Sequence, residues 1–336
     1  MTALSSLGDL ASLFRLQRQT GGIKSEVQNR ALELSSGRKA DLAGSLRGDW
    51  RGLASVEHRL GLASTERLAI AEARGFAQAA QTALGTMQGA ADSALAAVLA
   101  VPAAPTLNAA ERAGSVARHA FATAVGALNQ DSAGRSVFAG DATDGPALAP
   151  AETMLADLET AIAGLTTAAE VTAAVEAWFD TPGGSFESTG YIGSGTSLAP
   201  FSLGDNREEI GTRADDPRLR EMLKGLALGA LVGSPAFAGP VSERERLSHT
   251  AGERLLEGQG AVTGLQAGIG DSEAAIEAAM ARNGTETTAL EHSRADLVNA
   301  DPFEAATRLE AAQSQLETLF ALTARISRLS LTDYLR

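Results

Sequence analysis

Three side chains near residue 250 have the types and the spacing of a metal site. Glu245, His249 and Glu253 are spaced four residues apart, which places them on one face of a helix. Carboxylate oxygens and imidazole nitrogens are common ligands of transition metals. The same spacing is also common on solvated helix faces, and the neighbouring Arg244 and Arg254 would neutralise the glutamates. The sequence therefore favours a solvated helix face, and we expect no bound metal or cofactor.

Other residues with catalytic potential lack the partners that catalysis needs. The available near-neutral bases are His58, His119, His249 and His292. None of them lies in a nucleophile or zinc motif. Gly193-Ser194-Gly195 and Gly268-Ile269-Gly270 lack the third glycine and the Lys-Ser/Thr pair of phosphate-binding loops. Asp215-Asp216 is more simply a helix cap than an acid/base pair, because adjacent residues do not converge on one substrate. We predict that the protein is not an enzyme.

The composition favours close helix packing and a protein partner. Hydrophobic residues make up 44% of the 336 residues, but aromatic residues only 4%, and alanine is the dominant apolar type. The 28 Lys and Arg residues face 41 Asp and Glu residues, which gives a net charge of -13. Nucleic acids and anionic membranes require clustered cations. We therefore expect neither of them as a partner.

Export and redox chemistry are constrained by what the sequence lacks. The chain has no cysteine, which excludes disulfides and thiol chemistry. Residues 1–20 lack a basic segment followed by a continuous apolar stretch, so no cleaved secretory signal is expected. No window reaches the ~18 consecutive apolar residues of a membrane span, so no membrane insertion is expected. The protein either stays in the cytosol or leaves by a route that needs no such signal.

The elements that must position these residues are mostly long helices. Near the N-terminus, steps of three and four residues form a coiled-coil seam of Leu13, Leu16, Ile23, Val27 and Leu34, with Thr20 and Arg30 between them. This helix is expected to end at Ser35-Ser36-Gly37, because glycine takes the left-handed cap conformation. A second heptad series predicts a helix from about Asp49 to about Leu99, closed by Pro102 and Pro105.

The middle of the chain has shorter predicted elements. Asn108 as N-cap with Glu111 predicts a helix through about Asn129, and a single further helix is expected over Glu152–Phe179. Asp216-Pro217 predicts the start of a short helix through Leu231. The Val137–Gly140 segment is expected to form a short strand or a turn. The Gly/Ser/Thr-rich region predicts short strands at Phe186–Ile192, Ser197–Leu203 and Glu209–Arg213, with a turn at Gly204-Asp205-Asn206.

The C-terminal part returns to long helices. A heptad series recurs at Leu255, Val262, Ile269, Ile276, Leu290 and Leu297, interrupted by Asn283. Asn283-Gly284 is a candidate interruption of that helix. Asp301-Pro302 predicts a new helix, whose series is Ala305, Leu309, Ala312, Leu316, Leu319, Thr323 and Ile326.

The predicted fold is mainly α. It is a long antiparallel helical rod or coiled-coil bundle built from both termini, with a small inserted α+β middle domain. The expected division is a terminal helix and turn (1–48), rod helices (49–134), the inserted domain (135–240), a returning rod helix (241–300) and a C-terminal helix (301–336). Periodicity does not distinguish pairing within the chain from pairing between copies, and an ordinary elongated helical bundle is the alternative.

Motifs at both ends resemble the flagellin family. Leu34-Ser35-Ser36-Gly37-Arg38 resembles the helix and Ser-Ser-Gly turn that precede the family's long rod helix. Asp301–Ala306, the helix through Ile326 and Leu329–Leu335 are similar to the family's C-terminal helix. Arg135–Gly140, with the following Asp, Thr and Pro, resembles the hook-associated branch that links the flagellar hook to the filament. Residues 1–12 lack the Ile-x-Thr-Asn opening of filament flagellins.

This resemblance implies a structural axial protein of the bacterial flagellum. Such a protein is exported unfolded by the flagellar type III apparatus, without a cleaved signal, and is located outside the cell. The implied partners are other copies of the chain, a hook-side junction protein, flagellin and an export chaperone. The residues expected to pack between subunits are Leu13, Leu16, Ile23, Val27, Leu34, Leu309, Leu316, Leu319, Ile326, Leu331 and Leu335. A filament-forming flagellin and, more remotely, a cytosolic coiled-coil scaffold are the alternatives.

Overall fold

The computed structural model describes residues 2–101, 106–204 and 206–334, with the side chains of 2–10, 12, 13 and 326–334 left out. The chain forms two compact units. The first, which we call the terminal unit, combines residues 1–63 with residues 284–336, and the second, the central unit, comprises residues 64–283. Helices α3 (Arg51–Leu99) and α8 (Val241–Val298) contribute residues to both units.

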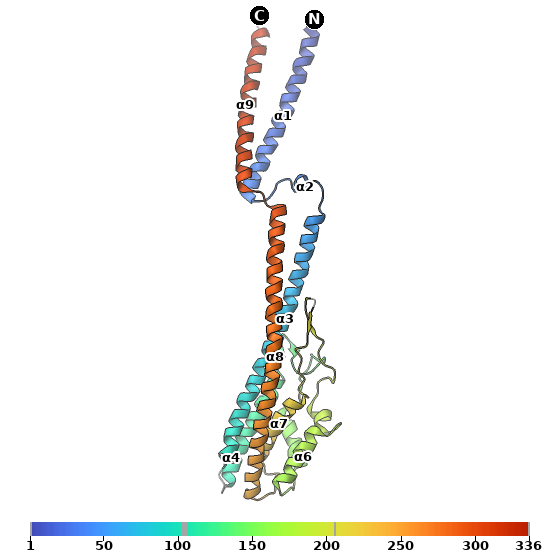
Figure 1. Ribbon diagram of the computed structural model, residues 1–336, viewed down its shortest axis with the longest axis vertical. Coiled ribbons are helices and arrows are strands. Elements are labelled where there is room, and N and C mark those ends of the chain that lie inside the picture. Colours follow the sequence, from blue (N-terminus) through green and yellow to red (C-terminus); the bar gives the residue numbers. More distant parts are fainter. Residues whose placement is uncertain (1, 102–105, 205, 335–336) are drawn as a thin grey trace. The chain divides into compact units, whose positions relative to one another are not determined.

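The terminal unit is built around one pair of helices. Helix α1 (Thr2–Ser36) and helix α9 (Pro302–Tyr334) lie side by side as an antiparallel pair. Figure 1 shows them in blue and red, with the two chain ends at the same end of the pair. The unit also contains the short helix α2 (Leu42–Ser45), the start of α3 and the end of α8. Alternating seam residues on α1 and α9 account for this pairing.

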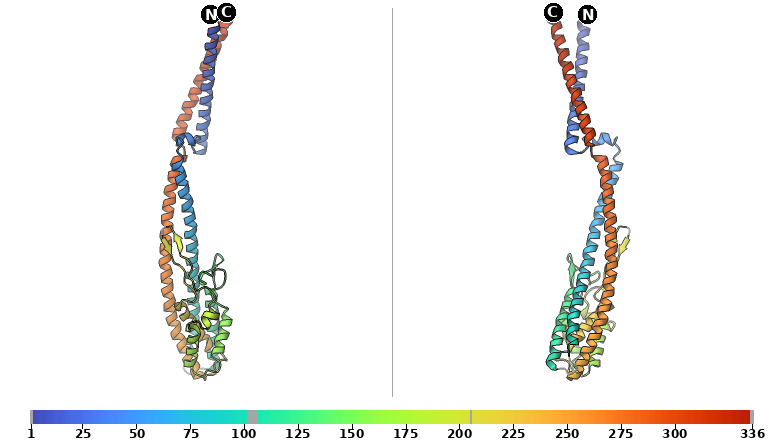
Figure 2. Two further views of the ribbon diagram at one scale, coloured as in Figure 1. Left: turned by 90° about the vertical axis from the view of Figure 1, so that its right-hand side faces the viewer. Right: turned by 60° about the vertical axis from the view of Figure 1, so that its left-hand side comes forward.

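The central unit surrounds parts of α3 and α8 with shorter elements. Its further helices are α4 (Leu107–Leu128), α5 (Ala151–Ala161), α6 (Ala168–Asp180), the π-helix η1 (Phe186–Gly190) and α7 (Pro217–Leu231). Strands β1 (Asp131–Ser132) and β2 (Arg135–Ser136) form one antiparallel hairpin, and β3 (Phe201–Leu203) and β4 (Asn206–Glu208) form another. Figure 2 shows the β3–β4 hairpin in yellow beside the long helices, where the Phe201 ring lies 5.3 Å from that of Phe76 on α3.

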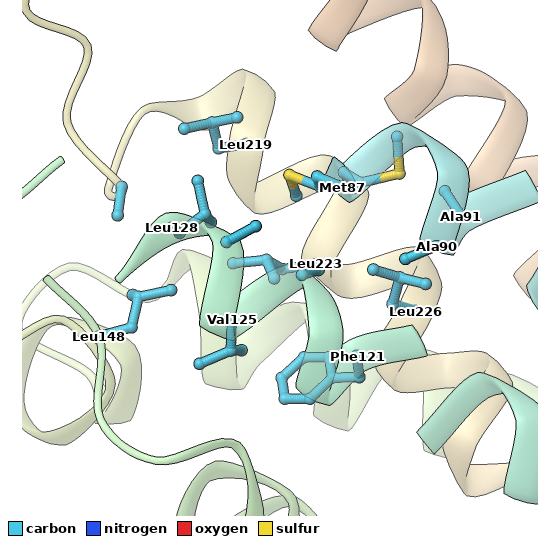
Figure 3. Close-up of a cluster of buried hydrophobic side chains, with 14 of the residues drawn as sticks. Met87, Ala90, Ala91, Phe121, Val125, Leu128, Leu148, Leu219, Leu223 and Leu226 are labelled. Atoms are coloured by element: carbon cyan, nitrogen blue, oxygen red, sulfur yellow. The ribbon is translucent and has the colours of Figure 1, made fainter. Parts of the chain in front are cut away.

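The hydrophobic core of the central unit lies where α7 meets α3 and α4. Figure 3 shows Leu223 and Leu226 of α7 beside Met87 of α3 and Phe121 of α4, and all four side chains are buried. Gly225 of α7 permits close approach to α8, because a Cβ atom there would lie 2.9 Å from the backbone nitrogen of Leu255. Small residues thus allow the helix backbones to pack closely, as the alanine-rich composition indicates.

A buried arginine closes the end of α7. The guanidinium of Arg244, on α8, donates hydrogen bonds to the carbonyl oxygens of Val232 (2.7 Å), Ser234 (3.1 Å) and Phe237 (2.6 Å). These carbonyls follow the last turn of α7, where backbone acceptors lack helical partners. Burial lowers the pKa of Arg244 from its ordinary value. The cation is therefore held by carbonyl dipoles in the core of the unit.

The structure confirms the predicted mainly helical fold and several element boundaries. Asp216 caps α7 by accepting a hydrogen bond from the backbone nitrogen of Arg218, with Pro217 at the first helical position. Gly37 ends α1 with φ of 68° and donates its N–H to the Glu33 carbonyl at 2.8 Å. Helix α8 runs without interruption past Asn283, whose side chain is buried. The five-part domain division stays a prediction.

Several predictions about the middle of the chain were wrong. The single helix over 152–179 is two helices, because Gly164 takes φ of 83° and Thr167 forms a capping box that starts α6. Thr106, rather than Asn108, caps α4, since the Thr106 hydroxyl accepts from the backbone nitrogen of Ala109. The closing residues Pro102 and Pro105 lie outside the described residues.

The strand predictions were correct only in part. Residues 186–190 form a π-helix whose Phe186 is buried against the Trp178 and Phe179 rings, so aromatic packing overrides the strand pattern. Residues 209–213 are not a strand. Only the last three residues of the predicted Ser197–Leu203 strand pair in a ladder, and their partner is β4. Asp205, at the centre of the predicted turn, lies outside the described residues.

Candidate assembly surface

Of the residues singled out for metal binding on α8, Glu245 is half-buried, whereas His249 and Glu253 are exposed. His249 Nδ1 is 3.4 Å from Glu253 Oε1, and the two side chains are 74% and 63% exposed. Within the residues that the structure describes, no group of three His, Cys, Asp or Glu side chains is arranged to hold a metal ion. None of the described helices is long and apolar enough to cross a membrane. The candidate functional surface lies instead on the α1·α9 pair.

The candidate phosphate loops and acid pair are structural. Gly193 packs against the backbone of Ala139, and Gly268 and Gly270 lie within α8. Asp215 accepts from Arg213 at 2.7 Å, whereas Asp216 caps α7. Partial burial opposes ionisation of Asp216, but hydrogen bonds from Arg218 outweigh it and hold the pKa of this carboxyl below its ordinary value.

The structure brings most of the predicted subunit-packing residues together along the α1·α9 pair. Leu16, Ile23 and Val27 of α1 are half-buried, as are Leu309 and Leu316 of α9. The deepest apolar positions among the described side chains are on α9, where Ala305, Ala312 and Leu319 are 3%, 4% and 6% exposed. These residues follow the seam series of both helices. One side of each helix is therefore covered within the chain, and the role of these residues between copies stays a prediction.

The other predicted packing residues are either exposed or outside the described side chains. Leu34 is 45% exposed, because Glu33 occupies the buried position at the end of α1. Leu13, Ile326 and Leu331 lie in helices, but their side chains are outside the described ones. Leu335 lies outside the described residues. The covered seam thus ends one residue before the heptad pattern indicates.

Sequence reasoning missed a second set of apolar residues on the same helices. Phe14, Leu32, Phe303, Phe320 and Leu322 are exposed. Phe303 is 83% exposed and Phe14 is 68% exposed, although both are large aromatic side chains. The signal available in the sequence was that these apolar residues fall outside the three-and-four spacing of the seam on each helix. They leave the pair with apolar surface that the chain itself does not cover.

The Ser35-Ser36-Gly37 turn connects this pair to α8. The Ala300 N–H donates to the Gly37 carbonyl at 3.0 Å, and the Lys39 N–H donates to the Val298 carbonyl at 2.9 Å. The Lys39 ammonium also donates to the carbonyls of Asp296 and Leu297 at the end of α8. A cation at a helix C-terminus is favoured by the helix dipole. These hydrogen bonds thus fix the segment that follows α1 to the end of α8 and the residues after it.

The 135–140 segment, which resembles the hook-associated branch, is mostly buried in the central unit. Phe138 is fully buried, and its carbonyl accepts from the Ala214 N–H at 2.9 Å. The Ala139 carbonyl accepts from Ser194 at 2.8 Å. Gly140 has φ of 67°, and a Cβ atom there would collide with the Thr196 carbonyl oxygen. This segment therefore organises the loops of the central unit.

Charge is distributed unequally between the units. Basic and acidic residues are equal in number in the terminal unit, so the whole net charge of -13 lies on the central unit. Copies of a neutral unit can be packed side by side without net repulsion, whereas copies of a strongly acidic unit repel one another. The exposed apolar residues of α1 and α9 thus lie on the unit that carries no net charge, whereas those of the central unit, such as Leu68 and Leu256, lie on the acidic one.

Comparison with known proteins supports the resemblance noted in the sequence. Residues 257–335 match the family model of the bacterial flagellin C-terminal helical region. No curated protein sequence matches the chain. A solved structure of a flagellar hook-associated protein from Vibrio parahaemolyticus has the same fold, with a TM-score of 0.52 and 15% sequence identity over 73% of this chain and 95% of that chain. The predicted resemblance is confirmed in the C-terminal region and in the fold.

Proposed function

We propose that this chain, whose C-terminal part is a flagellin C-terminal helical region, is a structural axial protein of the bacterial flagellum. Its α1·α9 pair packs against the pairs of neighbouring copies. The exposed aromatic residues of the pair carry this proposal, because Phe14 and Phe303 remain mostly in contact with solvent in the single chain. Packing between copies would remove this surface from water, at about 25 cal/mol per Å² of apolar area.

The charge distribution supports the same arrangement. Neutral terminal units can pack together without net repulsion, whereas the acidic central units repel one another. We expect α1 and α9 to be labile in a dilute single chain and protected in the assembly, because one seam between two helices buries few large side chains. Hydrogen exchange measures this difference. Full protection of both helices in the dilute chain would contradict the proposed mechanism.

Within the flagellum, we assign the chain to the junction between hook and filament. The 135–146 segment and the likeness of the fold to a hook-associated protein support this role. The proposed partners are a hook-side junction protein, flagellin and an export chaperone. Export without a cleaved signal and a place outside the cell belong to the same proposal.

A filament-forming flagellin is the second candidate, because the matching family model is that of flagellin. The number of copies distinguishes the two roles. A junction protein is a minor, ring-sized component of isolated flagella, whereas a filament subunit is the dominant one. A cytosolic scaffold would be absent from the culture fluid of cells whose flagellar export gate is open.

Deletion of the gene tests the junction role directly. We expect the deleted cells to build hooks and to release unpolymerised filament protein, and wild-type protein to restore filaments. Normal filaments in the deleted cells would refute the junction role.

A matched pair of variants tests the surface. Phe303→Ser should impair incorporation into flagella, whereas Leu107→Ser, which changes an exposed apolar residue of the central unit, should not. Equal incorporation of the two variants would contradict the assignment of the α1·α9 surface.

A further inference from the structure

A groove lies on the α1·α9 pair, near the middle of both helices. Its volume is about 570 Å³, within the range of clefts that bury a small organic ligand. Phe320 forms one wall and is 49% exposed. A Cβ atom added at Gly21, on the opposite wall, would meet nothing within 4 Å. The other uncharged lining residues with described side chains are Leu16, Gln17 and Thr20 of α1 and Thr323 of α9.

The backbone contacts at the base of the pair place the two walls of this groove opposite each other. The Ala300 N–H donates to the Gly37 carbonyl at 3.0 Å, so these two residues are level. Gln17 precedes Gly37 by 20 residues, and Phe320 follows Ala300 by 20 residues. Because both helices rise by about 1.5 Å per residue, Gln17 and Phe320 lie at about the same height. The groove therefore belongs to the register that the base contacts set.

Lys24 gives the groove a positive charge. It is the one charged residue among the lining residues with described side chains. Its ammonium lies 5.6 Å from the centre of the Phe320 ring. A cation beside an apolar wall attracts the face of a further aromatic ring and nearby carboxylates. A fitting occupant of the groove therefore combines a large aromatic side chain with acidic neighbours.

Phe303, at the start of α9, has both properties. Its side chain is 83% exposed. The carboxylate of Asp301 accepts hydrogen bonds from the backbone nitrogens of Phe303 (2.8 Å) and Glu304 (3.3 Å), which fixes the first turn of the helix. Asp301 and Glu304 outnumber the one nearby base, Arg308, which pairs with Glu304. The ring is thus presented by an ordered turn, which lowers the entropy cost of binding.

Other exposed aromatic residues of the terminal unit fit the groove less well than Phe303. Phe14 is 68% exposed, but it lies beside Arg15 and one turn from Arg18, which carry the same charge as the groove. Trp50 is 46% exposed, and its two charged neighbours form an ion pair with each other. Charge complementarity therefore favours Phe303.

We infer that Phe303 of one copy inserts into the groove of a neighbouring copy, where its ring packs against Phe320 and its acidic neighbours approach Lys24. The chain does not fill its own groove in this way, because Phe303 precedes Phe320 by 17 residues on the same helix. That separation is roughly 25 Å along the axis. The inference rests on the proposed function for its setting, and it names the contact between copies.

This contact sets the axial step between neighbours. For copies that run parallel, ring and groove meet only when the two copies are displaced by roughly 25 Å along the axis. The ring and the groove are different surfaces, so each copy offers its groove to one neighbour and its ring to another. The contact therefore repeats from copy to copy and builds a stepped helical array rather than a flat ring.

A photoreactive ring at position 303 tests the contact directly. We would replace Phe303 by p-benzoylphenylalanine, which keeps an aromatic ring, illuminate flagella isolated from cells that lack the natural chain, and identify linked peptides by mass spectrometry. We expect links from position 303 to residues 16–21 or 320–323. Within one chain these residues lie roughly 20 Å or more from position 303 along the axis, so such links join two copies. Links only to other segments, or none in incorporated protein, would overturn the inference.

The same analogue at position 50 is the control for the occupant. Because Trp50 is an exposed aromatic residue of the same unit, it has a similar opportunity to meet neighbouring copies. We expect no links from position 50 to the groove. Links to the groove from position 50 and not from position 303 would assign the groove to a different occupant and refute the inference.

A matched pair of glycine variants tests the groove without a covalent link. Gly21 and Gly22 are both exposed helical residues at which an added Cβ atom meets nothing within 4 Å, and Gly21 alone of the two lines the groove. Leucine favours helix over glycine, so both variants should fold. Gly21→Leu should fill the groove and lower the ratio of incorporated to secreted protein by about tenfold, whereas Gly22→Leu should keep the wild-type ratio. Equal ratios for the two variants would refute the inference, whereas absence of the wild-type protein from flagella would refute the proposed function instead.

Discussion

The same truncation, Leu→Ala, should have different consequences in the two units of this chain. Leu223 is fully buried in the core of the central unit, where Figure 3 shows it between α3 and α4 side chains. Leu319 is 6% exposed, but it packs only in the seam of the α1·α9 pair. Burial alone would predict similar losses for both. If the helix pair becomes ordered only on assembly, the two losses must appear in different experiments.

For the dilute single chain we expect Leu223→Ala to cost about 3 kcal/mol, within the usual range for a buried leucine. With a urea m-value of about 3 kcal/mol/M, the unfolding midpoint of the central unit should fall by about 1 M. Leu319→Ala should leave that midpoint unchanged and should instead reduce incorporation into flagella. Circular dichroism during urea unfolding measures the midpoints. A Leu319→Ala midpoint that falls as far as that of Leu223→Ala would show that both units unfold together, and would refute this reasoning.

Three further outcomes follow from the central unit. Gly225→Ala should destabilise the central unit by about 1 to 3 kcal/mol in urea unfolding, because the added Cβ atom meets the α8 backbone. Its control is Gly126→Ala, where the Cβ atom enters open space and should stabilise α4 by about 0.5 to 1 kcal/mol. Arg244→Met should cost about 3 kcal/mol in the same assay, since three carbonyl acceptors lose their donor. Burial, and after it the negative charge of Asp215, raises the pKa of Tyr191 to about 12. The Tyr191 hydroxyl therefore loses its proton at lower pH in the unfolded chain than in the folded one, and the free energy of unfolding should fall as pH rises from about 10 toward 12. Tyr191→Phe should abolish that part of the pH dependence, and an unchanged slope would contradict the assignment.

Local chemistry was sufficient to predict the long elements and their ends. The seam series on α1 and α9 depend only on helical spacing, and Gly37 and Asp216 act within one turn of their own positions. The middle of the chain was harder to predict, because Gly164 divides two helices that share one apolar pattern. The β-like composition of 186–190 gave way to packing among Trp178, Phe179 and Phe186.

The assembly surface was predictable in part. Heptad spacing identified which side of each helix is covered, but it did not reveal that Phe303 remains exposed, since exposure depends on which partner the chain provides. The contact between the Lys24 ammonium and the Phe320 ring likewise depends on how α1 and α9 pair in space.

By itself, the sequence determined that this protein is helical, that both its ends carry coiled-coil seams and that its C-terminal region is of flagellin type. These properties follow from residue spacing and local backbone preferences, which act over a few turns of helix. Only the tertiary structure decided that the two seams meet within one chain and that their pairing leaves aromatic residues exposed. The physical reason is that burial and register belong to pairs of distant segments, so no single segment specifies them.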